Sequence, residues 1–512
     1  ASALSCAAVT WERRVMKKLF LSCCLVLVVA SIGTMLTEPN LDSQVPVIYW
    51  ATDPNPARLE QVDKFHLWLV ENGHTTAAGE PVVELRLETV SADRKGVIQG
   101  VSGVAADIMD CNIPWYHSIG LLADVTDAAN QYGFGIDHTY RALEPLLSVD
   151  GRQYGFPCNV NVMGLWVNID TFEKLGLSPP PTNWDWETFE RIGREFVARA
   201  NPPGERQTAF FVNNIEHPYM IRALHRSMGA SEFNETLTRS GLGHEGFAGT
   251  LARIHKWTYA DHIAASAAEE SAFAAESGYS GAAMALFNRG NYGMYSIGRW
   301  CLIRLRQFDP PPRVGVSHFP YNHFPNAVIG TRAAGVYAGS PHVEKAKLFL
   351  AYLASEAYNY QIVTSADALP PNPQFTRIGE YLRPAEFPNE WGGHEIPSTG
   401  AETIAIATSV SPFVPAATVE RYKKKALDEV MADLVTPAEA ASEAARRIDE
   451  EIRLTLKESP KLQRKFAKYS ALQEQIDRYR GEGRKVPLEW IKNPFHQRYY
   501  LFKGWAEESL SE

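Results

Sequence analysis

The chain has 512 residues, enough for two or three domains, and its hydrophobic (45%) and charged (21%) fractions are ordinary for a globular protein. Its formal net charge of −9 excludes a molecule whose whole surface is built to bind nucleic acid. Aromatic residues make up 11% of the chain, which fits either a large core or rings that stack on sugar faces.

The N-terminus has the pattern of an export signal. Residues 16–18 read Met-Lys-Lys, residues 19–30 are nearly all apolar, and residues 31–33 offer small side chains for cleavage. We therefore expect residues 1–44 to be a leader segment and the mature protein to be periplasmic or otherwise extracytoplasmic. An uncleaved leader that stays as a membrane anchor is the alternative.

Removal of this leader leaves three cysteines, Cys111, Cys158 and Cys301. Their odd number and wide spacing exclude a disulfide-stapled scaffold, and no pair has metal-ligand spacing. We expect three small buried side chains, with a disulfide between two of them as the alternative. No cofactor and no metal is expected.

The first part of the mature chain alternates strands and helices. Apolar runs predict strands at 45–50, 81–90 and 104–109, and helical periodicity predicts a helix over 58–70. This order favours an α/β fold with a mainly parallel sheet, in which ligands bind at the carboxyl ends of the strands. The candidate site residues at these strand ends are Trp50, Asp53, Asp110 and Trp115.

Later elements are predicted from periodicity and from capping residues. An amphipathic helix is expected at 184–198 and a strand at 292–297. Ser340 followed by a proline is expected to cap a helix over 342–355. Thr436 opens a capping box at the start of another helix.

Three blocks, taken in order, resemble one family. The first reads Val-Asp-Gly-Arg-Gln-Tyr-Gly-Phe-Pro at 149–157 and leads to Trp-Asp-Trp at 184–186. The second reads Phe-Asn-Arg-Gly-Asn-Tyr-Gly-Met at 287–294 and ends in Gly-Arg-Trp at 298–300. The third covers 314–335. This set is similar to the signature of family 1 extracellular solute-binding proteins, the maltose-binding-protein-like sugar receptors of ABC importers.

The resemblance covers about residues 45–456 and implies the α/β fold of type II periplasmic binding proteins. In that fold two α/β lobes are joined by a hinge, and the ligand cleft lies between them. By this analogy the first lobe takes 45–157 and 313–357, and the second lobe takes 158–312 and 358–456. Residues 457–512 are expected to form a C-terminal helical extension.

The resemblance implies a carbohydrate-binding component and no enzyme. Such a protein captures a mono- or oligosaccharide by hinge closure and delivers it to the transmembrane subunits of an ABC permease. It is expected to be a monomer without a nucleic-acid partner, which meets the membrane only through its leader or its permease. An exported carbohydrate-active enzyme with cleft carboxylates and a sugar-sensing receptor of the same fold are the alternatives.

A sugar ring presents an apolar face, which suits aromatic rings, and a rim of hydroxyls, which suits Asp, Asn and Arg. Trp300 matches the Gly-x-Trp aromatic of the family and is expected to stack on the ligand. Asn161 is expected at the hinge, and Tyr219 matches an aromatic of the cleft. The complete expected ligand-binding set is Trp50, Asp53, Asp110, Trp115, Asn161, Tyr219, Arg299, Trp300, Arg332 and Phe413.

The extension is basic, with twelve Lys and Arg against five Asp and Glu between residues 457 and 503. Its apolar residues between 462 and 479 recur at helical spacing, which predicts a helix with one apolar face. We expect this helix to pack on a lobe with its basic face in solvent. Contact with an anionic membrane surface or with the permease is the alternative.

Overall fold

The computed structural model describes residues 45–89, 93–205, 207–273 and 281–507. The leader predicted for residues 1–44 lies outside this described part. Within the described ranges, no helix combines the length and the apolar character needed to cross a bilayer.

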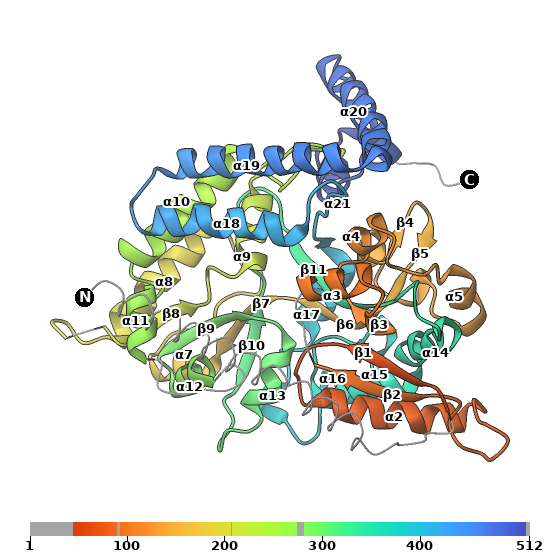
Figure 1. Cartoon of the computed structure of the whole chain (residues 1–512). Helices are drawn as coiled ribbons and strands as arrows, with labels where there is room; N and C mark the ends of the chain where they lie inside the picture. Colours follow the sequence, from red (N-terminus) through yellow and green to blue (C-terminus); the bar gives the residue numbers. More distant parts are fainter. Residues whose placement is uncertain (1–44, 90–92, 206, 274–280, 508–512) are drawn as a thin grey trace, which may run out of the picture. The chain divides into compact units, whose positions relative to one another are not determined.

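Two β-sheets organise the described chain (Figure 1). The large sheet has the strand order β12-β11-β3-β1-β2, and β6 also pairs with β11. Its strands are β1 (Val47–Ala51), β2 (Glu84–Glu88), β3 (Ile108–Asp110), β6 (Gly155–Val162), β11 (Ala327–Val336) and β12 (Ala405–Ala407). The small sheet has the order β10-β7-β9-β8. Its strands are β7 (Gly164–Asn168), β8 (Phe210–Asn213), β9 (Tyr292–Ile297) and β10 (Val314–Ser317). Two short pairs are β4 (Ser148–Val149) with β5 (Arg152–Gln153), and β13 (Val486–Pro487) with β14 (Ala506–Glu507).

The strand pairing brings several strand ends to one edge of the large sheet. β1 and β3 are parallel, with Trp50 opposite Ile108, so their carboxyl ends are adjacent. β11 runs antiparallel to both β3 and β6, with a register shift between Arg332 and Ala333. Figure 1 shows β11 and β6 in the middle, with β7–β10 on the left and β1–β3 on the right.

Helices cover the large sheet and form what we call the large-sheet lobe. Apolar residues of α2, α5, α14 and α15 share one core cluster with strand residues such as Ile48 and Phe156. The helices of this lobe are α2 (Ala57–Glu71), α3 (Asp93–Val101), α4 (Ile113–Ser118), α5 (Thr126–Tyr132), α6 (Glu144–Leu147), α14 (Val343–Ala354), α15 (Glu356–Ser365), α16 (Gly379–Leu382) and α17 (Glu395–Thr403).

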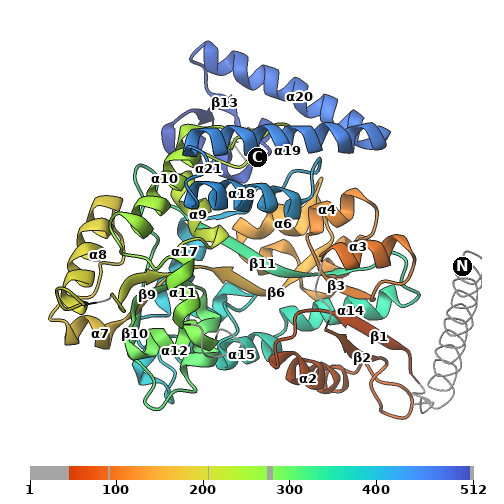
Figure 2. The same ribbon diagram turned by 60° about the vertical axis from the view of Figure 1, so that its left-hand side comes forward.

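The small sheet has its own helical cover, and we call this group the small-sheet lobe. Its helices are α7 (Ile169–Lys174), α8 (Trp186–Ala200), α9 (Pro218–Ser227), α10 (Glu245–Tyr259), α11 (Ala267–Phe273), α12 (Gly281–Arg289), α13 (Leu302–Leu305), α18 (Ala416–Met431) and α19 (Pro437–Glu458). The extension forms α20 (Pro460–Gly481) and α21 (Pro494–Lys503). Figure 2 shows α18, α19 and α20 together above β11. Short 3₁₀ turns are η1 (Ile136–His138), η2 (Arg141–Leu143), η3 (Arg299–Cys301), η4 (Pro373–Thr376), η5 (Pro388–Glu390) and η6 (Leu488–Trp490).

The predicted alternation of strands and helices is confirmed, with small shifts at the element ends. The helix predicted over 58–70 is α2, and the strand predicted at 292–297 is β9 with the same bounds. The strand predicted at 104–109 is shorter, because β3 begins at Ile108. The helix predicted in the extension is α20, and its Phe466 and Tyr469 pack against the core of the small-sheet lobe.

The two lobes divide the chain at different residues from those expected. β10, expected in the first lobe, pairs with β7 of the small sheet. Tyr358 and Ile362 of α15, expected in the second lobe, belong to the core cluster of α2 and α14. The large sheet keeps β6 as far as Val162, beyond the expected boundary at 157. The physical reason is contact between segments distant in sequence: β10 pairs with β7, β6 pairs with β11, and α15 packs against α2.

No disulfide joins the three cysteines, all of which lie in the described ranges. Cys158 and Cys301 are buried, as expected, and burial raises the pKa of both thiols. Cys111 is half-buried.

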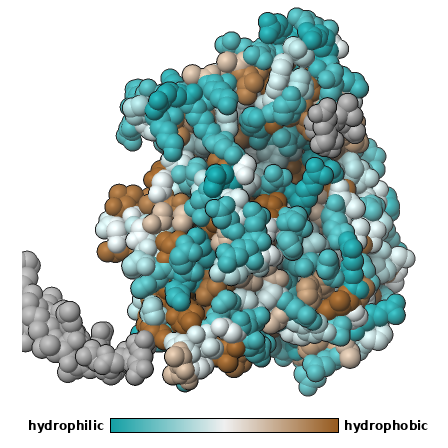
Figure 3. Space-filling view, turned by 90° about the vertical axis from the view of Figure 1, so that its right-hand side faces the viewer, coloured by the Kyte–Doolittle hydropathy of each residue, from teal (hydrophilic) through white to brown (hydrophobic). Residues whose placement is uncertain are grey.

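Hydrophilic residues cover most of the face shown in Figure 3, and hydrophobic residues occur there in small groups. Such scattered apolar residues are usual on protein surfaces. The candidate sites on this molecule are therefore its pockets and its polar clusters.

Candidate functional site

An ionic cluster lies at the edge of the large sheet where β1 and β3 end. Asp53 pairs with Arg58 (Oδ1–Nε, 2.9 Å) and with Arg332 (Oδ2–Nη1, 2.7 Å). Nε of Arg332 lies 3.0 Å from Oδ2 of Asp110. The buried Asp367 holds Arg58 from the other side at 2.5 Å. Three carboxylates thus fix two guanidinium groups in place.

Buried neighbours orient this cluster. The indole Nε1 of Trp50 donates to Oδ1 of Asp110 at 2.8 Å, and Thr52 Oγ1 donates to Oδ2 at 2.6 Å. Trp50 is fully buried and its ring packs against Phe349, with 4.7 Å between ring centroids. The structure therefore gives Trp50 a positioning role behind Asp110, which differs from the predicted contact with a ligand.

The charge of Asp53 is stabilised although the residue is partly buried. Burial alone would raise the pKa of Asp53, but the adjacent Arg332 and Arg58 outweigh burial and hold the pKa at about 2. Its side chain remains 38% exposed. Nη2 of Arg332 is buried and has no hydrogen-bond partner among the described residues. The cluster therefore leaves part of the Asp53 carboxylate accessible, next to a buried donor that no described residue uses.

Beyond the ionic cluster, the crossing strands β6 and β11 carry further polar residues. Together with the cluster, these residues form what we call the polar row. Arg332 lies opposite Asn159, and Gly330 lies opposite Asn161. Tyr219 of α9 reaches the same place, since a Cβ on Gly330 would lie only 2.0 Å from its hydroxyl oxygen. Glycine at 330 thus permits a close approach between the two lobes, and Tyr219, Asn161 and Arg332 follow one another along it.

The start of α9 is fixed by a histidine cap. Nδ1 of His217 accepts a hydrogen bond from the backbone N of Tyr219 at 3.1 Å. Burial lowers the pKa of His217 to about 4, and Arg222 contributes to the shift. The imidazole is therefore neutral at pH 7, as an acceptor must be, and it holds the Tyr219 backbone in place.

A pocket of about 510 Å³ lies in the small-sheet lobe beside the carboxyl end of β8. Its polar lining residues are Asn213, Asn214, Glu216, Glu270, Ser271, Tyr292 and Tyr295. Asn213 Nδ2 donates to Glu270 Oε1 at 3.0 Å. Burial raises the pKa of Glu216 and of Glu270, and their mutual repulsion adds to the shift at Glu270. Rings, amides and carboxyls in a pocket of this size suit a small polar ligand.

Trp300 lies in η3, directly after β9. Its ring folds over Gly298, where a Cβ would lie 1.8 Å from a ring carbon. The side chain is half-buried and packs against both core clusters of the small-sheet lobe. Part of the indole therefore remains open to contact.

Three other predicted residues have structural partners. Arg299 is 2% exposed and donates to the carbonyls of residues 362, 363 and 368, at 3.4, 3.0 and 3.0 Å, which caps the end of α15. Phe413 is fully buried against Phe466 of α20, with 5.1 Å between ring centroids. Trp115 is half-buried in α4 and packs on the core of the large-sheet lobe.

The sequence interpretation missed the partners that complete both groups. These are Arg58 and Asp367 in the ionic cluster and Asn213, Asn214, Glu216, Glu270, Tyr292 and Tyr295 in the pocket. Asn213 is the last residue of β8 and Asn214 follows it, so the rule that selects Asp53 also selects them. Asp367 carries no such signal, because it meets Arg58 across 309 residues of sequence.

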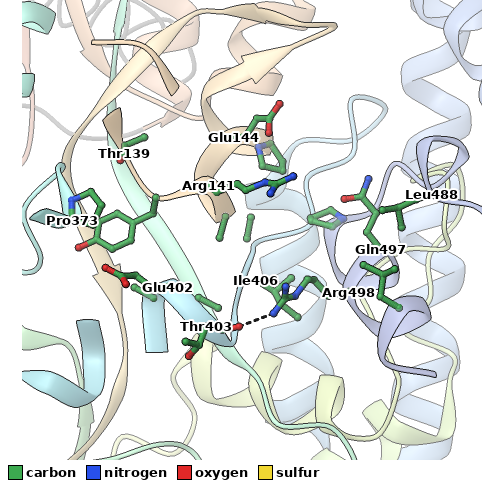
Figure 4. Close-up of a pocket in the computed structure, with 18 of the residues that line it drawn as sticks. Thr139, Arg141, Glu144, Pro373, Glu402, Thr403, Ile406, Leu488, Gln497 and Arg498 are labelled. Carbon is green, nitrogen blue, oxygen red and sulfur yellow. Dashed lines mark hydrogen bonds between the residues drawn. The ribbon is translucent and has the colours of Figure 1, made fainter. Parts of the chain in front are cut away.

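Another pocket of about 510 Å³ lies where η2, η4, the end of α17 and α21 come together (Figure 4). Arg498 of α21 donates to the carbonyl of Thr403 at 2.6 Å, and Glu402 pairs with Arg377 at 3.0 Å. Over the described ranges, no group of three His, Cys, Asp or Glu side chains is arranged to hold a metal ion.

Comparison with known proteins places this fold in a family. The model of the bacterial extracellular solute-binding proteins matches residues 81–360, more than half of the chain. A putative binding protein of Brucella abortus is 23% identical over 254 residues, which are 48% of this chain and 58% of that protein. A lactose-binding protein of Rhizobium radiobacter is 31% identical over 117 residues, 23% of this chain and 25% of that protein. The match thus spans only 58% of the length of the first curated relatives.

Solved structures share the fold over most of their length. An ABC substrate-binding protein of Listeria monocytogenes in complex with cycloalternan has a TM-score of 0.65 at 18% identity, covering 79% of this chain and 98% of that one. The maltose/maltodextrin-binding domain MalE of Bdellovibrio bacteriovorus, bound to maltotriose, has a TM-score of 0.60 at 17% identity, covering 80% and 100%. The chain therefore has the MalE-like type II fold of two α/β lobes joined by a hinge.

Proposed function

The chain belongs to the bacterial extracellular solute-binding proteins, and on this premise we propose that it captures a carbohydrate between its two lobes. The protein then delivers this ligand to the transmembrane subunits of an ABC importer. It binds its ligand without chemical change, since the family and the structural neighbours are binding proteins.

The observation that carries the proposal is the polar row between the lobes. Asp53 and Arg332 lie at one end, Asn161 follows, and Tyr219 reaches across from α9. Glu216 lies three residues before Tyr219 and lines the pocket of the small-sheet lobe together with Tyr292 and Asn213. Carboxylates, amides and guanidinium groups bind hydroxyls, and the rings bind apolar sugar faces. The proposed contact set is Asp53, Asn161, Glu216, Tyr219, Glu270, Tyr292, Trp300 and Arg332.

The similar proteins support a saccharide as the ligand. Those named above carry cycloalternan and maltotriose in their solved structures, and a curated relative is named for lactose. Closure of two hinged lobes around such a ligand excludes water and offers a permease a distinct conformation.

Isothermal titration calorimetry with lactose, maltotriose, cycloalternan and glucose tests the proposal. We expect saturable binding of at least one saccharide, with no products in the recovered ligand by chromatography. An absence of binding across a broad panel of neutral sugars would contradict the carbohydrate proposal. Turnover that disappears in Glu270→Gln would favour an enzyme instead.

The role of Trp300 is tested with the sugar found in that panel. Loss of stacking in Trp300→Ala is expected to weaken binding by about 1–3 kcal/mol, or roughly 5- to 150-fold. The matched control is Trp391→Ala, since Trp391 is 49% exposed and lies outside the contact set. Unchanged affinity in a folded Trp300→Ala protein would remove the residue from the site.

We propose that residues 1–44 direct export of the protein, and expression in a bacterium tests this proposal. N-terminal sequencing of the periplasmic protein should show a start near residue 34. A protein that keeps its N-terminus and sediments with membranes would show that the leader acts as an anchor.

A further inference from the structure

A pocket of about 370 Å³ lies between the extension and the two lobes, and its lining shares no residue with the contact set proposed for sugar. One wall comes from residues 114–118 of α4 and from 145–150 around β4. The opposite wall comes from residues 461–469 of α20, and Lys492 closes one side just before α21. Leu237, from the core cluster of the small-sheet lobe, and residues 408–412 also line it, so the extension closes a pocket to which both lobes contribute.

Positive charge collects in this pocket. Lys461, Lys465 and Lys492 line it, and Asp150 is the single carboxylate among its lining residues. Asp150 lies 3.4 Å from Lys465, but its side chain is 72% exposed. One mostly solvated carboxylate cannot balance three ammonium groups, so the lining keeps a net positive charge.

The effect of this crowding is visible on two lining groups. Burial lowers the pKa of Lys492, and repulsion from the nearby Lys468 lowers it further. Burial and repulsion from Lys461 and Lys465 likewise lower the pKa of His117. Burial and mutual repulsion therefore disfavour the positive charge of these lining groups, and a bound anion would reduce this repulsion.

Most of the remaining lining residues are apolar, and the exceptions are Ser118, Ser148 and Thr408. Leu237, Val410, Pro412 and Leu462 contribute aliphatic surface, and Tyr469 adds a ring that lies 5.6 Å from Nζ of Lys465. A bare ion would leave most of this surface without a contact. The volume and the mixed lining fit a small organic molecule with an anionic group.

We propose that this pocket binds a small organic anion bearing carboxylate or phosphate groups, which Lys461, Lys465 and Lys492 neutralise. The lining of this site shares no residue with the contact set proposed for sugar, and the inference goes beyond the proposed function. Because the lining comes from the extension and from both lobes, the bound anion contacts all three parts.

Calorimetry at constant ionic strength tests this site, with citrate as the carboxylate probe and inorganic phosphate as the phosphate probe. The double variant Lys465→Gln/Lys492→Gln removes two lining charges and keeps most of each side chain. The control Lys457→Gln/Lys485→Gln removes the same charge from two exposed lysines outside the pocket. We expect at least one probe to bind the wild type and the control with similar affinity, and the lining variant at least tenfold more weakly.

Several outcomes would overturn this proposal. Neither probe binding the wild type, or equal affinity in all three proteins, would do so. Binding to phosphatidylglycerol vesicles with no response to citrate or phosphate would show a basic membrane-facing surface instead. The lining variant should keep the wild-type affinity for the neutral sugar. Because anion binding and sugar binding are measured separately, a failure of the sugar proposal would leave the anion result unaffected. Its melting temperature, measured without anions, reports whether it is folded.

Discussion

Single side chains set the contact between the lobes, and the pair Gly330 and Tyr219 shows this most directly. Gly330→Ala would place a Cβ 2.0 Å from the tyrosine hydroxyl oxygen, so the ring has to move. We expect the substitution to destabilise the protein by about 1–3 kcal/mol, the usual cost of overpacking. Urea unfolding measures this loss.

The double variant Gly330→Ala/Tyr219→Phe is the control for that effect. Removal of the hydroxyl leaves the nearest ring carbon at 3.1 Å from the new Cβ, so we expect the double variant to recover part of the stability. If the losses of unfolding free energy in Tyr219→Phe and Gly330→Ala are instead simply additive in the double variant, the contact with the tyrosine hydroxyl is not what lowers the stability of Gly330→Ala.

Asp53 contributes a stability that depends on pH. Its folded pKa of about 2 lies below the ordinary value of 3.8, so its ion pairs stabilise the fold above about pH 4. This contribution is lost as the pH falls from about 4 to 2. We expect Asp53→Asn to lose less unfolding free energy than the wild type across that range in urea titrations. Asp63→Asn, on the exposed face of α2, should follow the wild type.

At the scale of elements, two helix starts show how far local sequence decides structure. Thr436 forms the predicted capping box with Glu439 at the start of α19. The sequence also predicts that Ser340, followed by a proline, caps a helix over 342–355, but α14 starts at Val343 after His342. The hydroxyl of Ser340 instead donates to Asp107 and accepts from the backbone N of His342. A partner 233 residues away thus overrode the local cap signal.

The capping box gives a prediction for α19. Thr436→Ala leaves the backbone N of Glu439 without its acceptor, so we expect a loss of about 1 kcal/mol in unfolding free energy. Thr436→Ser keeps the acceptor and should stay near the wild type. Equal losses in both variants would mean that the threonine methyl group, and not the cap, stabilises the helix.

The positions of the strand ends can be predicted from the sequence, but the face of the sheet on which each side chain lies is harder to predict. Asp53 and Asp110 follow parallel strands and do meet at one edge, as the sequence order predicts. Trp50 was assigned to the same edge, yet it shares the buried face of β1 with Ile48, two residues earlier. The period-two alternation of a strand already contains this information. Asp367 could not be found in this way, because only the folded chain brings it to Arg58.

At the scale of the whole molecule, the extension is part of the fold. Asn493 is fully buried and donates to Ser231 Oγ at 3.0 Å and to the carbonyl of Phe233 at 2.9 Å. Glu235 accepts a hydrogen bond from the hydroxyl of Tyr500. Burial would raise the pKa of Glu235, but His496 and the hydrogen bonds to the carboxylate outweigh burial and hold this pKa at about 2. The expected helix on a lobe is therefore anchored by buried polar contacts as well.

Truncation after Ser459 tests this anchoring. Removal of α20 and α21 exposes the ring of Phe413, which packs on Phe466 and Tyr469, and takes away the hydrogen-bond partners of Glu235. We expect a clearly lower melting temperature in circular dichroism, and Tyr500→Phe should show a smaller decrease. A truncated protein that melts like the full chain would show that the extension is dispensable for stability.

The pairing of β11 has a consequence for the order of folding. Among the described strands of the large sheet, β1, β2 and β3 pair with one another, while β6 joins them only through β11. Residues 155–162 therefore lack their neighbouring strand until residues 327–336 have been synthesised. Contacts over so long a separation in sequence form late and slowly. The two lobes can thus begin to collapse separately, but the surface that joins them is assembled only after two thirds of the chain has emerged from the ribosome.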